Sequence, residues 1–273
     1  MTQVIIDQDP NKFSTSALQV AKNSSLNRLY GANENLPEQY DLYQKLIAEF
    51  IGTGLFVYGV CAAGVFYGDR PPMAILGCGC MGGVIIYIFG RVSGAHFNPA
   101  VSLGLFLRHK LTAMELGLYI IAQLLGGFLG CTLLGLVRRG KFDEMSGNQI
   151  ASHLINLGDE YKKTGWCYVS ALIFEILGTF ILLMFILASC ERDNYLGPTL
   201  GLAFAATLIA IIGIGGNVSS CSLNPARSFA PALVQVFASG DKTPIKQIWI
   251  YIVGPFLGAI LAAFVWPVFV YAF

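Results

Sequence analysis

The chain has 273 residues, of which 55% are hydrophobic and 12% are charged, and its formal net charge is +1 at pH 7. Soluble domains carry about a quarter charged residues, so this composition excludes an ordinary water-soluble globule. The small net charge also excludes a nucleic-acid-binding protein, which needs a basic face. The seven cysteines form no paired pattern in the loops. The sequence therefore predicts neither a disulfide framework nor a metal site, and it implies no cofactor.

Apolar stretches follow one another from Leu46 to Ala272. A helix crosses the bilayer core with about 20 apolar residues, so these stretches hold about six spans. We predict spans at Gln44–Phe66, Met73–Val92, Thr112–Val137, Gly165–Ser189, Pro198–Gly215 and Lys246–Val270. Two apolar pieces of about half that length remain, Pro99–Leu107 and Pro225–Phe237. The sequence thus predicts an all-α, multi-pass membrane protein.

Two motifs occur twice in the chain. The segment EFIGT at Glu49 recurs as EILGT at Glu175, and Asn-Pro-Ala at Asn98 recurs at Asn224, so both second copies lie 126 residues after the first. Each copy holds three spans, an odd number, so the second copy enters the membrane from the opposite face and the repeats are inverted. We divide the chain into an N-terminal arm (1–43), a first repeat (44–137), a connecting loop (138–164) and a second repeat (165–273).

Each Asn-Pro-Ala motif begins one of the two half-length pieces. Asn favours the N-cap, and Pro suits the first helical position because its missing N–H has no intrahelical partner there. In inverted repeats the two half-helices are re-entrant and meet N-terminus to N-terminus near the midplane. Their positive dipole ends repel cations there, while the Asn amides donate to a passing oxygen. The pore residues predicted on this basis are Asn98, Pro99, Ala100, Asn224, Pro225 and Ala226.

At this point the sequence resembles the aquaporin family, the major intrinsic proteins. The resemblance extends from about Gln44 to Val270 through the segments AEFIGT, SGAHFNPAVSLG and NPARSFAPA. It implies an aquaporin-like fold of six tilted helices and two half-helices, with a pore in each subunit of a homotetramer. It also implies a channel for water or other small neutral solutes, not an enzyme, in a plasma or internal membrane. Both termini are then cytoplasmic, and the 138–164 loop is extracellular.

The same resemblance implies a narrow filter made of Cys78, Ile212, Cys221 and Arg227. An ionisable residue within the membrane region is by default functional, and an ion pair at the outer rim is the alternative for Arg227. Water-selective members typically carry Phe and His where this chain has Cys78 and Ile212, and glycerol-conducting members carry Trp and Gly. Because the chain fits neither pattern, the filter leaves strict water selectivity open.

Other family markers favour water. Ser228, Ala232 and Tyr251 stand where glycerol channels usually carry Asp, a basic residue and Pro, although Ile252 matches neither type. We predict water as the main solute. The alternative is a channel that also or mainly conducts glycerol, hydrogen peroxide or another small neutral solute.

Three polar residues are predicted to support the pore. A buried unpaired charge is costly, so Glu49 and Glu175 should accept hydrogen bonds from backbone N–H groups in the loops ahead of the half-helices. A proton relay is the alternative role for this pair. His96 precedes Asn98 by two residues and should line the pore or brace its loop.

The sequence also offers candidates for a gate at the cytoplasmic mouth. Leu26, Leu29 and Tyr30 of the arm and Tyr195 and Leu196 of the 191–198 loop are apolar residues in polar surroundings. A disordered arm is the alternative reading. Outside passive channels, a secondary transporter also uses inverted repeats. It needs a coupling-ion site, however, and the spans offer only Glu49 and Glu175, each in a structural position. A non-conducting adhesion protein of the same fold is the third class.

Overall fold

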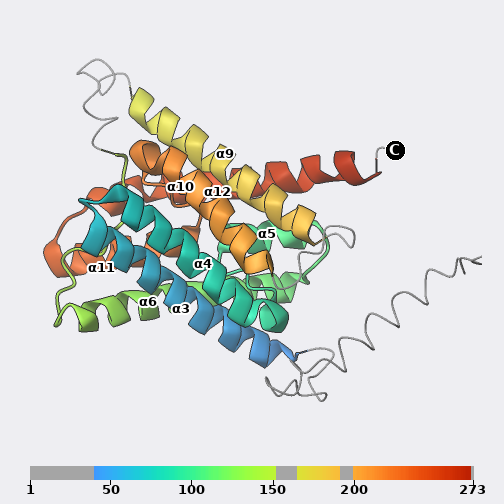
Figure 1. Cartoon of the computed structure of the whole chain (residues 1–273), viewed down its shortest axis with the longest axis horizontal. Helices are drawn as coiled ribbons and strands as arrows, with labels where there is room; N and C mark the ends of the chain where they lie inside the picture. Colours follow the sequence, from blue (N-terminus) through green and yellow to red (C-terminus); the bar gives the residue numbers. More distant parts are fainter. Residues whose placement is uncertain (1–39, 152–164, 191–198, 272–273) are drawn as a thin grey trace, which may run out of the picture. The chain divides into compact units, whose positions relative to one another are not determined.

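The computed structural model describes residues 40–151, 165–190 and 199–271. This part of the chain is built of helices joined by turns and loops (Figure 1). The six long helices are α3 (Leu42–Tyr67), α4 (Pro71–Ser93), α6 (Ala113–Val137), α9 (Trp166–Ser189), α10 (Leu200–Ser219) and α12 (Thr243–Tyr271). The two short ones are α5 (Pro99–Leu107) and α11 (Pro225–Ser239). All six long helices have the length and apolar composition of a membrane span, which confirms the predicted fold class.

Local capping explains where several helices begin and end. Helix α3 begins two residues before the predicted span because Asp41, its N-cap, forms a capping box with Gln44 of the first turn. Helix α11 runs two residues past its predicted end and stops at Gly240, whose φ of 73° is left-handed. Helix α5 has the predicted bounds. The ends of α6 and α9 and the start of α11 also agree with the prediction, and the remaining boundaries shift by one to four residues.

Close helix contacts depend on glycine and follow the repeat. Helix α3 packs along α6, and α9 packs along α12. A Cβ atom added to Gly126 of α6 or to Gly258 of α12 would lie 2.3 Å from a backbone oxygen of the facing helix. The repeats also meet where α4 crosses α10, at Gly83 and Gly201. Small residues at such crossings let helices approach closely in lipid.

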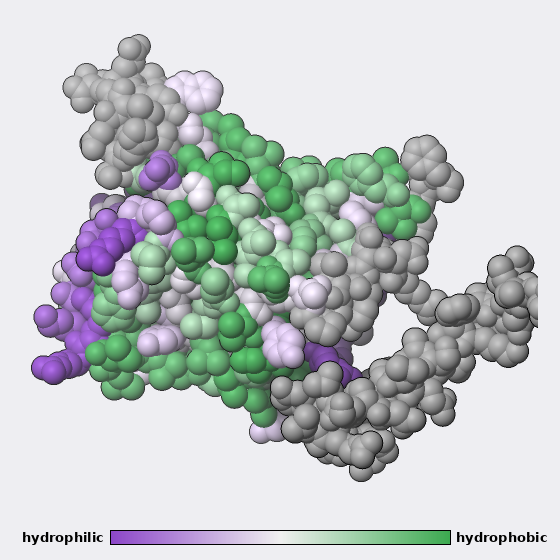
Figure 2. Space-filling view, in the orientation of Figure 1, coloured by the Kyte–Doolittle hydropathy of each residue, from purple (hydrophilic) through white to green (hydrophobic). Residues whose placement is uncertain are grey.

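The exterior is apolar, whereas many polar groups are buried. Figure 2 shows hydrophobic residues over most of the visible face and hydrophilic residues gathered mainly at one end. Large exposed side chains include Tyr87, Ile214 and Phe264, each at least 70% exposed. In contrast, Glu49 and Glu175 are wholly buried. This distribution suits a lipid-embedded protein with a polar pathway inside.

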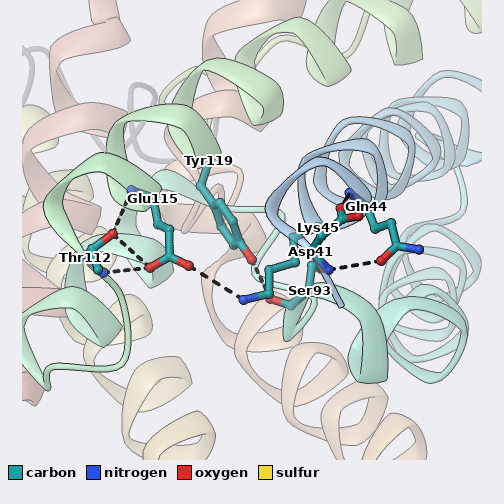
Figure 3. Close-up of polar contacts among 7 residues, drawn as sticks. All are labelled: Asp41, Gln44, Lys45, Ser93, Thr112, Glu115 and Tyr119. Carbon is teal, nitrogen blue, oxygen red and sulfur yellow. Dashed lines mark hydrogen bonds and ion pairs between the residues drawn. The ribbon is translucent and has the colours of Figure 1, made fainter. Parts of the chain in front are cut away.

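The starts of α3 and α6 are tied together by polar contacts (Figure 3). Lys45 Nζ lies 3.6 Å from Glu115 Oε1, and the other Glu115 oxygen closes a capping box with Thr112. One turn further along α6, the Tyr119 hydroxyl donates to the Ser93 carbonyl at the end of α4 over 2.9 Å. These contacts hold three helix ends of the first repeat beside the loop that leads into α5.

The candidate gate residues Leu26, Leu29, Tyr30, Tyr195 and Leu196 lie outside the described residues. The same holds for residues 152–164 of the connecting loop and for 1–39 of the arm.

Candidate pore and filter

The N-termini of the two short helices meet through two asparagines. The Asn98 side-chain oxygen accepts from Ala100 N at 2.9 Å, and that of Asn224 accepts from Ala226 N at 3.0 Å, so each residue caps its own helix. Their amide nitrogens cross to the opposite repeat. Asn98 Nδ2 donates to the Leu223 carbonyl at 2.7 Å, and Asn224 Nδ2 donates to the Phe97 carbonyl at 2.8 Å. Because an amide nitrogen carries two hydrogens, each asparagine retains one further donor.

Two buried carboxyl groups hold the loops ahead of these helices. Glu49 accepts from the backbone N–H groups of His96 at 2.9 Å and Phe97 at 2.7 Å. Glu175 accepts from those of Ser222 at 2.8 Å and Leu223 at 2.7 Å. These are the backbone bonds that the sequence predicts.

Each carboxyl group also binds a serine that the sequence reading missed. The Ser93 hydroxyl donates to Glu49, and the Ser219 hydroxyl donates to Glu175, both at 2.6 Å. The two serines lie 126 residues apart, as do the two glutamates. Alignment of the repeats at that spacing was therefore a signal that could have found them.

Both loops have unusual backbone conformations. Ala95 and Phe97 in the first loop and Cys221 and Leu223 in the second have φ between 46° and 58°. The left-handed region is costly for residues other than glycine, so the surroundings must fix it. The bonds to the two buried carboxyl groups do this. They leave the carbonyls of Phe97 and Leu223 facing the asparagine of the other repeat.

The two loops are equivalent in backbone but not in side chains. His96 Nδ1 lies 3.1 Å from Ser102 Oγ, and the His96 ring meets the Tyr119 ring edge-on with centroids 5.1 Å apart. Gln123 donates to both Glu49 and Ser102. In the second repeat, the Ser222 and Ser228 hydroxyls bond directly to each other. His96 thus braces its loop and also lines the cavity beside the asparagines. Gln123, which no motif marks, was missed.

Three of the four predicted filter residues, Cys78, Ile212 and Cys221, lie in adjoining apolar clusters. Cys78 of α4 packs with Val60 and Ala63 of α3, and Ile212 of α10 contacts this cluster. Ile212 also contacts the cluster that contains Cys221. Cys78 and Cys221 are buried, with free thiols. The region is therefore apolar apart from these thiols and the neighbouring Arg227.

Arg227 is 95% buried near the start of α11 and is held by the loop that connects the repeats. Its Nη1 donates to the Ser146 carbonyl at 3.1 Å and to the Asn148 side-chain oxygen. Asn148 also accepts from Ser228 Oγ at 2.8 Å and donates to the Ser220 carbonyl at 3.3 Å. None of the ion pairs between described residues includes Arg227, so this part of the structure shows no outer-rim ion pair. Asn148 was missed because it looks like an ordinary loop residue.

The described part of the connecting loop, 138–151, folds into the protein. Met145 is wholly buried, and Ile150 N donates to the Gln247 side chain at 2.7 Å. Ala151 N donates to the Val218 carbonyl, and the Ser220 hydroxyl donates to the Gln149 carbonyl. The loop thereby places Asn148 against Arg227.

Two neighbouring cavities lie among these elements. The smaller, about 40 Å³, is lined by Asn98 and Asn224 and by Phe56, His96 and Leu182, among others. One water needs about 10–15 Å³ of such space, so the cavity has room for a few waters. The larger, about 770 Å³, opens between the ends of α4, α9 and α10.

Six apolar helices around two re-entrant half-helices, with capped N-termini that meet beside a water-sized cavity, define a membrane channel built from inverted repeats. The chain matches the family described as "Major intrinsic protein" over residues 37–266. It belongs to this family. It is accordingly an integral multi-pass membrane protein and a passive channel for small solutes, not an enzyme.

Relatives from plants and bacteria span most of the chain. It is 36% identical to Aquaporin NIP1-1 of Zea mays, with 81% of this chain and 72% of the relative covered. It is 34% identical to Nodulin-26 of Glycine max, with 82% and 77% covered. It is also 34% identical to Aquaporin Z of Brucella melitensis, with 82% and 97% covered. Among solved structures, the aquaglyceroporin of Plasmodium falciparum shares its fold, with a TM-score of 0.71 and 22% identity over 85% of this chain and 98% of that one.

Proposed function

We propose that this chain conducts water as its main solute and excludes ions and protons. The observation that carries the proposal is the reciprocal bonding of Asn98 and Asn224 to the opposite loops. It fixes both amides beside the small cavity and leaves each with a second hydrogen to donate. A water that accepts both hydrogens turns its own hydrogens away from the pair, along the pore.

Charge at the same place supports the exclusion of cations. Each half-helix begins there with roughly half a positive elementary charge. No carboxylate counters the two dipoles within hydrogen-bond reach of the asparagine side chains in the described structure. A hydronium or metal cation is repelled, and a proton cannot hop through a water whose hydrogens point away from a common donor pair.

Arg227 provides a second fixed charge, and we propose that it forms the filter with Cys78, Ile212 and Cys221. Its guanidinium is held by Ser146 and Asn148, so its remaining donors can bind a solute oxygen while its charge repels cations. The neighbouring side chains are uncharged and two of them are small. A second solute is therefore a real alternative, namely glycerol, hydrogen peroxide or another small neutral molecule.

Stopped-flow light scattering on proteoliposomes tests the assignment. The proposal expects water permeability far above that of empty liposomes and a lower glycerol permeability in the same vesicles. Glycerol permeability that equals or exceeds water permeability would replace water with glycerol as the main solute. Absence of any osmotic permeability would favour the adhesion class.

The assembly, orientation and regulation proposed here rest on the sequence and the family. We propose a homotetramer with both termini in the cytoplasm, and a gate in which the arm (Leu26, Leu29, Tyr30) or the 191–198 loop (Tyr195, Leu196) closes the cytoplasmic mouth. Deletion of residues 2–35 should raise water flux per channel. Unchanged flux at equal protein density would show that the arm does not close the channel.

A further inference from the structure

Five residues line both cavities and so lie between them. They are Ile86, Ala95, Val101, Ile186 and Phe204. We call this ring the apolar neck, because none of its side chains carries a hydrogen-bonding group. On one side of it lies the small cavity with the two pore asparagines. On the other side lies the large vestibule between the ends of α4, α9 and α10.

The apolar neck is the image of the filter under the internal repeat. The repeat spacing of 126 residues pairs Phe204 with Cys78, Ile86 with Ile212, Ala95 with Cys221, and Val101 with Arg227. It pairs the fifth neck residue, Ile186, with Val60, whose carbonyl lies 3.8 Å from the Cys78 sulfur. Every filter residue thus has its counterpart in the neck.

The hydrogen bonds show that this spacing is a spatial relation and not only a numerical one. Glu49 and Glu175 make the same bonds within their own repeats. Asn98 and Asn224 make the same bonds to the opposite repeat, again at this spacing. The two asparagines bond across the meeting point, so the relation exchanges the two sides of that point. None of the four filter residues lines either cavity. This agrees with a filter on the other side of the asparagine pair.

The filter and the apolar neck differ in their side chains at two of the paired positions. The aromatic side chain that the filter lacks at Cys78 is present in the neck as Phe204, which is 91% buried. Its ring lies against that of Phe185, with centroids 6.3 Å apart. Where the filter has the cation Arg227, the neck has Val101. A solute in the neck must therefore give up hydrogen bonds to water without receiving any from side chains.

We infer that the apolar neck is a second selectivity constriction of this channel and that the Phe204 ring, rather than the filter, sets the upper size limit for solutes. The inference rests on the proposed function as a channel for water and small neutral solutes. Water crosses such a ring by bonding to the water ahead and behind. Glycerol must shed more hydrogen bonds than water and needs more width.

The test compares water and glycerol permeability of the full chain in proteoliposomes at equal protein density. Phe204→Ala should raise the glycerol-to-water permeability ratio several-fold over the wild type. Phe264→Ala is the matched control, because it deletes the same ring from a side chain that is 70% exposed on the outer surface, and it should leave the ratio unchanged. An unchanged ratio in folded Phe204→Ala protein would overturn the inference.

A second comparison separates the neck from the filter. Cys78→Ala enlarges the repeat-related position, and its effect on the ratio should be smaller than that of Phe204→Ala; an equal or larger effect would place the size limit in the filter and refute the inference. Should Phe204→Ala fail to fold, Phe204→Leu and Val101→Ala widen the same ring less drastically and are expected to raise the ratio in the same direction. Wild-type vesicles with no water permeability would refute the proposed function, whereas wild-type water flux with unaltered ratios in all neck variants would refute only the neck.

Discussion

The guanidinium of Arg227 donates to the side-chain oxygen of Asn148, so a residue of the connecting loop fixes the charge at the proposed filter. Asn148 is 99% buried and binds Ser228 and the Ser220 carbonyl at the same time. It therefore joins the loop, the start of α11 and the end of α10. The position of the cation therefore depends on residues of the connecting loop.

Asn148→Ala should lower the water permeability per channel several-fold. It removes one acceptor from the Arg227 guanidinium and leaves the Ser146 carbonyl as the other. The charged group then gains by turning toward pore water. Asn148→Asp keeps an acceptor oxygen and should retain more of the flux. Stopped-flow shrinkage of proteoliposomes measures both. Wild-type flux in Asn148→Ala would show that Asn148 does not position the cation.

Glu175→Gln should destabilise the folded channel by about 2–3 kcal/mol, because the amide nitrogen of glutamine cannot accept and one loop N–H or hydroxyl is left unpaired. The readout is the thermal unfolding midpoint of the purified protein. Glu144→Gln is the matched control, since that side chain is 76% exposed in its ion pair with Arg138, and exposed pairs contribute little. Equal midpoints for the two variants would argue against a supporting role for Glu175.

Asn224→Asp should convert the meeting point of the half-helices into a site that attracts cations. A carboxylate there opposes the two dipole ends and removes one amide donor. We expect a cation current in planar bilayers that the wild type lacks. Asn217→Asp adds the same charge at an exposed position of α10 and should stay silent. A silent Asn224→Asp channel that still conducts water would show that ions are excluded elsewhere.

Mercury should block water flux through Cys221, because this buried thiol shares a cluster with the proposed filter residue Ile212. Cys221→Ser should therefore conduct in the presence of mercury. Cys80→Ser, which alters an exposed thiol, should remain sensitive. Full sensitivity of Cys221→Ser would move the reactive site to another thiol, with Cys78 the next candidate.

Much of the fold could be predicted because membrane spans and helix caps are local signals. The apolar lengths predicted six spans, and the Asn-Pro pairs predicted where α5 and α11 begin. The inverted repeat followed from one spacing. The predicted helix ends were less accurate, because the observed ends depend on capping contacts such as that of Asp41 with Gln44.

The site was only partly predictable because its supports are tertiary. Glu49 and Glu175 attract notice as charges in apolar spans, but Asn148 is one polar residue in a polar loop, and only the folded loop brings it to Arg227. In the sequence, Phe204 and Val101 look like ordinary apolar residues of their helices. Their importance appears only when the cavities are compared with the repeat.

We propose above that two half-helix ends, joined through Asn98 and Asn224, let water pass and stop ions. The most direct measurement is the ionic conductance of planar bilayers that contain wild-type protein shown to conduct water in vesicles from the same preparation. We predict a conductance equal to that of the empty bilayer at every protein density. A cation current that grows in proportion to the amount of protein would contradict the claim.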